Sequence, residues 1–400
     1  MFKKGCMARK VRRHGGGARR MLSRAHLWFG LTIGLIWALQ GLTGAVLVFH
    51  RELDRAVLPS LQQGDPLPLG QLLATVSARM PAPPESIGRV DDGPSILVVN
   101  YTDADGKRRG ILLDAVTGAI LAQRNWRPSS PAEGSTTRWI YELHHRLLLG
   151  DAGGLLLGAS GLLLLFSASW GLWLAWPRRG AWRATFDVRL WRTRAQRLYG
   201  WHRLIGLCAT GVLVALAVTG ATMDFDKPLR GFSQSHLPYR PAFTMLPGPV
   251  AQPVVSADQA VGIARARLPQ AAFVSLALPS RRLNAYQVRL RQPGEWRRWS
   301  GTSLVTVDPA SGRVLDVYDA ASAPLANRLL ESAFAFHSGE VAGFLGRLAV
   351  LFAGLALPTL YVTGVWSWLR RRRASTRELC DARTAASVIS GPSRPQERAS

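Results

Sequence analysis

The chain has 400 residues and a formal net charge of +25, from 50 Lys and Arg against 25 Asp and Glu. In a soluble protein such a charge suggests nucleic-acid binding, but four long apolar segments indicate a membrane protein whose basic residues define its orientation. We therefore expect the chain to sit in a lipid bilayer and to have no nucleic-acid partner. Three cysteines, two in the polar tails and one in an apolar segment, exclude a disulfide framework.

A transmembrane helix needs roughly 20 apolar residues to cross a hydrocarbon core of about 30 Å. Four segments meet this requirement, at about 27–49, 154–176, 203–223 and 346–369. With their flanking residues we delimit the membrane segments as 26–50, 141–177 (which includes a preceding helix), 201–224 and 336–370. The first segment follows a basic stretch and ends without a small-residue cleavage site, so we expect a retained helix rather than a signal peptide.

The distribution of charge predicts the topology. Residues 1–25 contain nine Lys and Arg and no acid, the loop 178–200 contains seven Arg and one Asp, and four arginines follow the last apolar segment. Lys and Arg accumulate on the cytoplasmic side of a membrane. We therefore expect the tails, 1–25 and 371–400, and the loop 178–200 to be cytoplasmic, and the segments 51–140 and 225–335 to lie outside.

Each outer segment has the pattern of a small α+β module. In the first module we expect a helix at 69–80, strands at 95–101 and 107–114, and a turn at 114–118. In the second, Ser256 is a helix N-cap and Pro269 stops the helix. Strands should follow at 273–278, 285–290, 303–307 and 314–318, with an Asp-x-x-x-Gly turn at 308–312.

The sequence contains an internal repeat. His26, Thr43 and Gly44 recur 176 residues later as His202, Thr219 and Gly220, and a shift of 193 places His144 on His337. Between them, 114–121 recurs at 308–315. Because both copies enter the membrane from the same side, we predict an all-α membrane four-helix bundle with a parallel internal repeat, plus two outer α+β modules. Its pseudo-two-fold axis should run along the membrane normal.

The repeat sorts four histidines into two pairs, His26 with His202 and His144 with His337. Ionisable side chains in membrane helices usually have a function, and two imidazoles from facing helices can supply both axial ligands of a haem iron. We therefore expect two haems held by these pairs. They should be b-type, because the chain has no Cys-x-x-Cys-His attachment motif.

Other residues near the pairs are candidates for the same sites. Arg24 and Arg203, beside the first pair, are expected to meet the haem propionates. His145 adjoins His144 and is the alternative ligand, although the repeat places Ser338 opposite it. His144 and Trp176 would be about 50 Å apart in one continuous helix. We therefore expect either a break at 150–154 or a haem at the membrane surface.

The chain has no zinc-ligand cluster and no phosphate-binding glycine loop of the nucleotide, nicotinamide or flavin type. We predict no catalytic residue beyond the haem relay, and a reductant that is lipid-soluble or bound to another protein. In the second module, six arginines alternate with Tyr286, Trp296 and Trp299. They would form either a cationic docking surface or a solvated strand face.

Several short motifs carry a family resemblance. They are Leu42-Thr43-Gly44, Trp176-Pro177-Arg178-Arg179, Trp201-His202-Arg203, His337-Ser338-Gly339-Glu340 and Thr363-Gly364-Val365-Trp366. At these residues the chain resembles the PepSY-associated transmembrane family of bacterial inner-membrane proteins, over about 24–373. The resemblance implies that the two outer modules are periplasmic PepSY domains and that both termini of this multi-pass protein are cytoplasmic.

Members of this family resemble iron-regulated membrane proteins, and some are di-haem siderophore reductases. The resemblance therefore implies a haem-dependent oxidoreductase that passes electrons to a periplasmic ferric siderophore and releases Fe(II). The electron donor would be a quinol or a cytoplasmic flavoprotein. Two alternatives remain open: a sensor or accessory protein whose PepSY modules bind a periplasmic protein, and an iron or copper permease.

Overall fold

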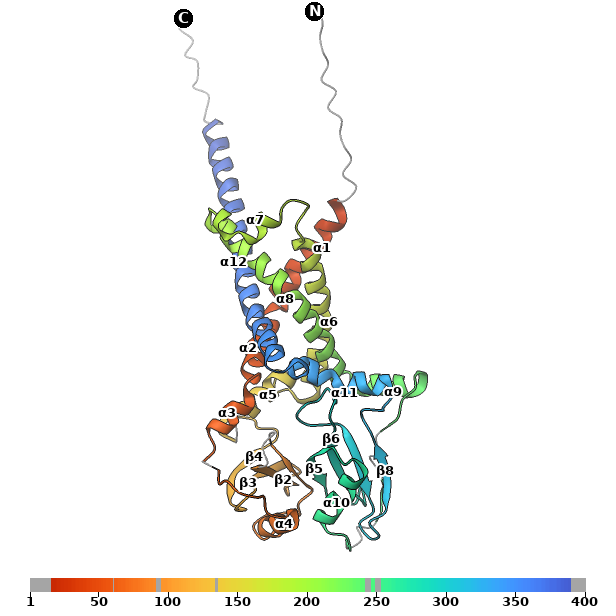
Figure 1. Ribbon diagram of the computed structural model, residues 1–400. Helices are drawn as coiled ribbons and strands as arrows, with labels where there is room; N and C mark the ends of the chain where they lie inside the picture. Colours follow the sequence, from red (N-terminus) through yellow and green to blue (C-terminus); the bar gives the residue numbers. More distant parts are fainter. Residues whose placement is uncertain are drawn as a thin grey trace, which may run out of the picture. The chain divides into compact units, whose positions relative to one another are not determined.

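The computed structural model describes residues 16–59, 61–90, 95–133, 136–241, 246–248 and 253–389 (Figure 1). Residues 1–15 and 390–400, in the two predicted tails, lie outside the described residues. The chain divides into two compact units. One contains the residues up to 38, 166–210 and the residues from 356 onward, and the other contains 39–165 and 211–355.

The four predicted apolar segments are helical. They lie in α1 (Gly16–Thr32) with α2 (Gly34–Leu47), α6 (Gly150–Ala175), α8 (Arg194–Asp224) and α12 (Gly343–Ile389). Three helices are long and apolar enough to cross a membrane, and α1 with α2 makes a fourth span if the bent pair counts as one. A membrane protein with three to four such helices in its described residues is consistent with the sequence prediction.

The first span is not the single straight helix that the sequence predicted. α1 and α2 meet at an angle of 61°. Gly34 begins α2 at this break, and a Cβ atom added there would lie 2.8 Å from Cδ2 of Tyr361. Because only glycine lets that ring approach so closely, Gly34 accounts for the packing at the bend, and glycine positions are frequent sites of helix kinks.

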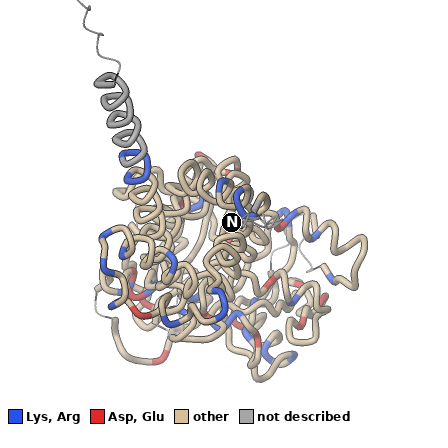
Figure 2. The backbone as a smooth tube through the Cα atoms, turned by 90° about the horizontal axis from the view of Figure 1, so that it is seen from above, with Lys and Arg blue, Asp and Glu red and all other residues tan. Residues whose placement is uncertain are grey.

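Two helices extend beyond the predicted membrane segments. α1 begins at Gly16, ten residues before the predicted start at 26. α12 continues to Ile389, past the predicted end at 370. Residues 371–389 are rich in Ala and Arg, which are strong helix formers. Figure 2 shows basic residues on this helix just before its grey end, where Arg370–Arg373 follow the apolar part.

The two outer modules share one antiparallel sheet, which the sequence did not predict. Its strands are β1 (Ser86–Arg89), β2 (Ile96–Thr102), β3 (Arg108–Asp114), β4 (Ile120–Asn125), β5 (Ala272–Ala277), β6 (Tyr286–Arg291), β7 (Ser303–Val307) and β8 (Val314–Tyr318). Their order is β4-β3-β2-β1-β5-β6-β7-β8. β1 and β5 join the modules, with Ile87 opposite Leu276. The six predicted strands are confirmed within one or two residues, whereas β1 and β4 were not predicted.

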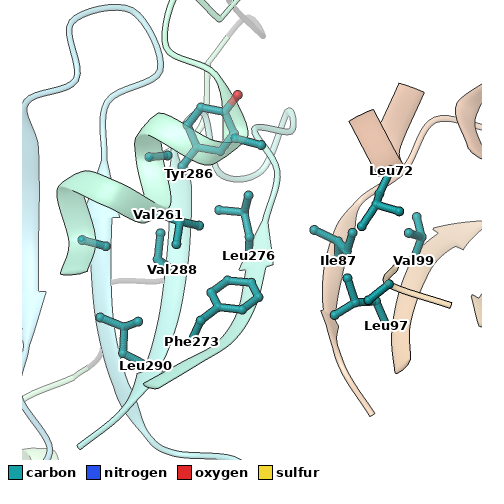
Figure 3. Close-up of a cluster of buried hydrophobic side chains, with 14 of the residues drawn as sticks. Leu72, Ile87, Leu97, Val99, Val261, Phe273, Leu276, Tyr286, Val288 and Leu290 are labelled. Carbon is teal, nitrogen blue, oxygen red and sulfur yellow. The ribbon is translucent and has the colours of Figure 1, made fainter. Parts of the chain in front are cut away.

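A common core also connects the two modules (Figure 3). α4 (Leu69–Ser77) places Leu72 and α10 (Ala257–Arg267) places Val261 in one apolar cluster with residues of both halves of the sheet. The carboxylate of Asp258 on α10 accepts hydrogen bonds from the backbone N–H groups of Leu69 and Gly70, at 2.8 and 2.9 Å. It thus caps the N-terminus of α4 from the other module.

Short helices connect the sheet to the long helices. They are α3 (His50–Ala56), α5 (Thr136–Arg146), α9 (Asp226–His236) and α11 (Leu325–His337). In Figure 1, α5, α9 and α11 lie between the sheet and the adjoining ends of the long helices in the same unit. The remaining short elements are α7 (Trp182–Phe186) and the 3₁₀ helices Pro131–Glu133, Val188–Leu190 and Glu340–Ala342.

The chain turns sharply at 147–149, between α5 and α6. The helix is therefore interrupted just before residues 150–154, where the break was expected, and those residues begin α6. Leu147 and Leu148 have positive φ angles of 51° and 59°. A Cβ atom on Gly153 would lie 1.7 Å from the carbonyl oxygen of Arg146, so only glycine fits. The turn from α11 into α12 has the same contact, because a Cβ atom on Gly346 would lie 2.0 Å from the oxygen of Gly339.

Candidate metal centres

The first candidate centre contains His26 on α1 and His202 on α8, both in the unit that includes residues 166–210. The two imidazole rings lie close together in an edge-on arrangement, with their centroids 6.4 Å apart and their planes at 79°. Both side chains are partly buried. The residues that the repeat made equivalent therefore lie together.

The second candidate centre contains His144 on α5 and His337 on α11, in the unit that also contains the sheet. Their ring centroids are 6.2 Å apart, and their planes make an angle of 55°. Each of these histidines lies at or near the C-terminal end of its short helix, where the chain turns into a long helix. The two centres thus repeat one arrangement: two imidazoles from different helices at almost the same separation.

Each imidazole has a hydrogen-bond partner on a second helix. His144 Nδ1 is bonded to Thr43 Oγ1 at 2.9 Å, and His337 Nδ1 to Thr219 Oγ1 at 3.0 Å. In the first centre, His202 Nδ1 is bonded to Thr363 Oγ1 at 2.9 Å. His26 Nδ1 lies 3.0 Å from the carbonyl oxygen and 3.1 Å from Oγ of Ser167. In all four rings Nδ1 is engaged, so Nε2 is the atom on the opposite side that remains to bind a metal.

A glycine lies against each ring on the same helix as the hydrogen-bond partner. Cβ atoms added to Gly171 and Gly44 would lie 3.0 Å from Cε1 of His26 and His144. The corresponding distances are 3.3 Å for Gly220 and His337, and 3.5 Å for Gly364 and His202. Small residues therefore let these helices approach the imidazoles closely.

The other predicted site residues lie near the pairs without facing them. His145 stacks on Tyr141, with ring centroids 5.5 Å apart, and its Nδ1 accepts a hydrogen bond from Arg146 at 3.3 Å. The structure thus places His144, and not His145, opposite His337. Arg203 donates from Nε to the carbonyl oxygen of Ala175 at the end of α6, at 2.8 Å. Arg24, on α1, is exposed.

The arginines of the second module mostly contact their own domain. Arg289 donates to the carbonyl oxygen of Gly301, and Arg291 to that of Arg298. The guanidinium of Arg297 lies 5.2 Å from the centre of the Phe334 ring, and burial lowers the pKa of this arginine. These contacts favour a structural role for much of the arginine-rich strand face over a wholly solvated or ligand-binding one.

Sequence reasoning missed the hydroxyl partners of the four imidazoles. The available signal was the Thr-Gly dipeptide, which occurs at 43–44, 219–220 and 363–364 in the long helices. In the sequence this dipeptide is a feature of the repeat and of the family motifs, and nothing in it points to the histidines. No comparable dipeptide marks Ser167 in the sequence, because it lies four residues before Gly171 and not next to it. Its contact with His26 is also shorter through the backbone carbonyl than through the hydroxyl, and a backbone group leaves no sequence signal.

The apolar helices and the antiparallel sheet define a membrane protein with an appended α+β domain. Residues 23–371 match the family model described as PepSY-associated TM region. The chain therefore belongs to this family, as its sequence motifs predicted. A comparison with curated proteins found no match.

Proposed function

We propose that this protein is a haem-containing reductase of the bacterial inner membrane that transfers electrons across the membrane to a periplasmic ferric siderophore. The observation that carries the proposal is the pairing of the four histidines. Two pairs, contributed by four different helices, have nearly identical ring separations of 6.4 and 6.2 Å. A purely structural role would not predict that a histidine lies at this distance from a second histidine in both halves of the chain.

The separation fits a metal between the two rings. An imidazole nitrogen binds a first-row transition metal at about 2.0 Å, and the ring centre lies about 1.1 Å behind it, so opposed imidazoles have centres roughly 6.2 Å apart. The separations in the two pairs, 6.4 and 6.2 Å, lie within about 0.2 Å of this value. His26 with His202, and His144 with His337, would hold the two metals.

The donor set favours haem over a bare ion. Within the described residues, no group of three or more His, Cys, Asp or Glu side chains could hold a metal ion. Two imidazoles alone supply too few donor atoms to hold a transition metal firmly, whereas haem brings its own nitrogen donors and would be held by the two histidines of a pair. Bound haem would supply a one-electron redox couple. Arg24 and Arg203 are the proposed partners of the propionates of the first haem.

We further infer that the long helices form a four-helix bundle with a parallel internal repeat. Contacts that the repeat relates support this. A Cβ atom on Gly161 would lie 3.6 Å from the carbonyl oxygen of Ala217, and one on Gly354 would lie 2.8 Å from that of Gly41. Gly161 and Gly354 differ by 193 residues, and Gly41 and Ala217 by 176, which are the two shifts found in the sequence. Equivalent helices therefore pack through equivalent small residues.

The charge distribution supports cytoplasmic termini. The loop 178–200 and Arg370–Arg373 carry most of the basic charge next to the long helices, which is expected of the cytoplasmic side. The sheet would then lie in the periplasm. There it would receive a ferric chelate, and one electron would convert Fe(III), which a siderophore binds tightly, to Fe(II), which it releases. The electron would come from a quinol or a cytoplasmic flavoprotein.

Quantifying haem in the purified protein tests this proposal. We expect about two acid-acetone-extractable haems per chain by pyridine haemochrome, with a Soret band and sharp α and β bands after reduction. Dithionite-reduced protein should be reoxidised anaerobically by a ferric siderophore, and Fe(II) should appear with ferrozine. Absence of haem would refute the proposal and favour a sensor or a permease. Haem that stays reduced with hydroxamate, catecholate and citrate chelates would refute ferric reduction.

A further inference from the structure

Threonine hydroxyls contact three of the four paired imidazoles. Thr43, Thr219 and Thr363 lie on α2, α8 and α12, and each is followed by the glycine that touches the same ring. The histidine comes from another helix in every case. The contacts therefore do not arise from local sequence, and they recur in both candidate centres.

Each of these hydroxyls already donates its proton within its own helix. Oγ1 of Thr43 donates to the carbonyl oxygen of Leu39 at 2.8 Å, and Thr219 and Thr363 donate to the residues four positions before them at 2.7 Å. A hydroxyl has one proton and two lone pairs. Toward the imidazole, the threonine oxygen can therefore act only as an acceptor, so the ring must donate from Nδ1.

The tautomer of the ring follows from this constraint. A neutral imidazole that carries its proton on Nδ1 has its lone pair on Nε2, and the bond made by one ring nitrogen sets the state of the other. His26 should also carry its proton on Nδ1, since the carbonyl oxygen of Ser167 can only accept a hydrogen bond. All four rings would thus present a basic Nε2 atom.

We propose that Thr43, Thr219 and Thr363 are positioning residues that hold His144, His337 and His202 in the Nδ1–H tautomer, with Nε2 ready to bind the haem iron. The identity of the bound group rests on the proposed function, but the tautomer does not. Within each dipeptide, the threonine sets the protonated nitrogen and the glycine leaves space for the ring. Ser167 offers His26 both its backbone carbonyl and its hydroxyl, at 3.0 and 3.1 Å, so Ser167→Ala would leave one close acceptor in place. Backbone carbonyls of Gln40, Leu216 and Leu360 also face the other three imidazoles.

The tautomer can be measured without haem. In full-length apoprotein with ¹⁵N-labelled histidine, the four paired rings should show a protonated Nδ1 and an unprotonated Nε2 at neutral pH. Thr43→Val, which keeps the shape of the side chain but removes the hydroxyl acceptor, should weaken this preference for His144 alone, where the backbone of Gln40 remains as an acceptor. Thr43→Ser should restore it. An Nε2–H tautomer in the wild type, or no change at His144 in the valine variant, would overturn the proposal.

Haem retention gives a second readout. Loss of a hydrogen bond to a metal-binding histidine typically lowers metal affinity by about 10- to 100-fold, so each Thr→Val variant should lose haem faster by about that factor. Thr222→Val is the matched control, because Thr222 also donates to a carbonyl four residues earlier on α8, at 2.8 Å, and among the described residues the hydroxyls bonded to the paired histidines come from Thr43, Thr219, Thr363 and Ser167. Ser167→Ala should have a much smaller effect than Thr363→Val.

The two proposals fail in different ways. A wild-type protein without haem would refute the reductase, while the ¹⁵N measurement would still decide the role of the threonines. Haem that is bound normally, and retained equally by the wild type and the Thr43→Val, Thr219→Val and Thr363→Val variants, would refute the positioning role alone. Equal losses in these variants and in Thr222→Val would also refute it, because a general packing defect would then explain the effect.

Discussion

The glycines that face the imidazoles allow a graded prediction. A Cβ atom on Gly44 or Gly171 would lie 3.0 Å from an imidazole carbon, about 0.4 Å short of the 3.4 Å at which ordinary van der Waals contact begins. On Gly364 it would lie at 3.5 Å, which needs no movement. Gly171→Ala and Gly364→Ala therefore perturb the two ligands of the same proposed haem to different extents.

The expected magnitude follows from the overlap. Overpacking of a close-packed site costs about 1–3 kcal/mol, which corresponds to roughly 5- to 150-fold in affinity. We expect Gly44→Ala and Gly171→Ala to accelerate haem loss by a factor in this range, and Gly364→Ala by less than about twofold. Gly220→Ala, with a distance of 3.3 Å, should be intermediate.

Transfer of haem to excess apomyoglobin, followed in the visible spectrum, measures these rates. Gly211→Ala on α8 is the control, since a Cβ atom there meets nothing within 4 Å. Alanine is more favourable than glycine inside a helix by about 1 kcal/mol. The Gly→Ala variants should therefore show no general loss of stability in thermal unfolding. If Gly364→Ala loses haem as fast as Gly171→Ala, the close approach to the ring is not what glycine provides.

Three further predictions concern the ligands and the outer domain. His26→Ala and His202→Ala should deplete the same haem in visible and EPR spectra; depletion of two different haems would contradict their pairing. Burial alone would raise the pKa of Asp114, but hydrogen bonds from nearby backbone N–H groups lower it below the usual value. The ionised form is thus favoured in the folded state, so its contribution to stability should be present above about pH 4 and lost as the pH falls through the folded-state pKa. Asp114→Asn should flatten this part of the profile in urea unfolding, and an unchanged profile would refute the assignment. Asp258→Ala should destabilise the outer domain by about 1 kcal/mol through loss of the α4 cap, and unchanged urea unfolding would show that the cap is dispensable.

The sequence alone was sufficient for the apolar helices and most of the strands. Long apolar runs can form only helices or barrels in a membrane, because every backbone polar group must be satisfied internally. Strands β7 and β8 were predicted with the right bounds because period-two patterns and an Asp-x-x-x-Gly turn are local signals. The break after α5 was also expected, since Gly150, Gly153 and Gly154 cluster at one point.

Other elements depend on contacts that the sequence did not reveal. β1 has only four residues, and its place between β2 and β5 comes from pairing with both neighbours. β4 could have been predicted, because the 194-residue shift of the internal repeat aligns its residues with those of β8. The bend between α1 and α2 reflects the approach of Tyr361 to Gly34, which are 327 positions apart in the chain.

For the candidate centres, the repeat in the sequence was enough to predict which histidines pair, because duplicated helices bring equivalent positions to the same depth. It also favoured His144 over His145, which it places opposite Ser338, but it did not reveal the separation of the rings or the contacts with Thr43, Thr219 and Thr363. These depend on how far each helix is rotated about its axis and how closely its neighbours pack. Such rotations and distances are properties of assembled helices, and only the tertiary structure decided them.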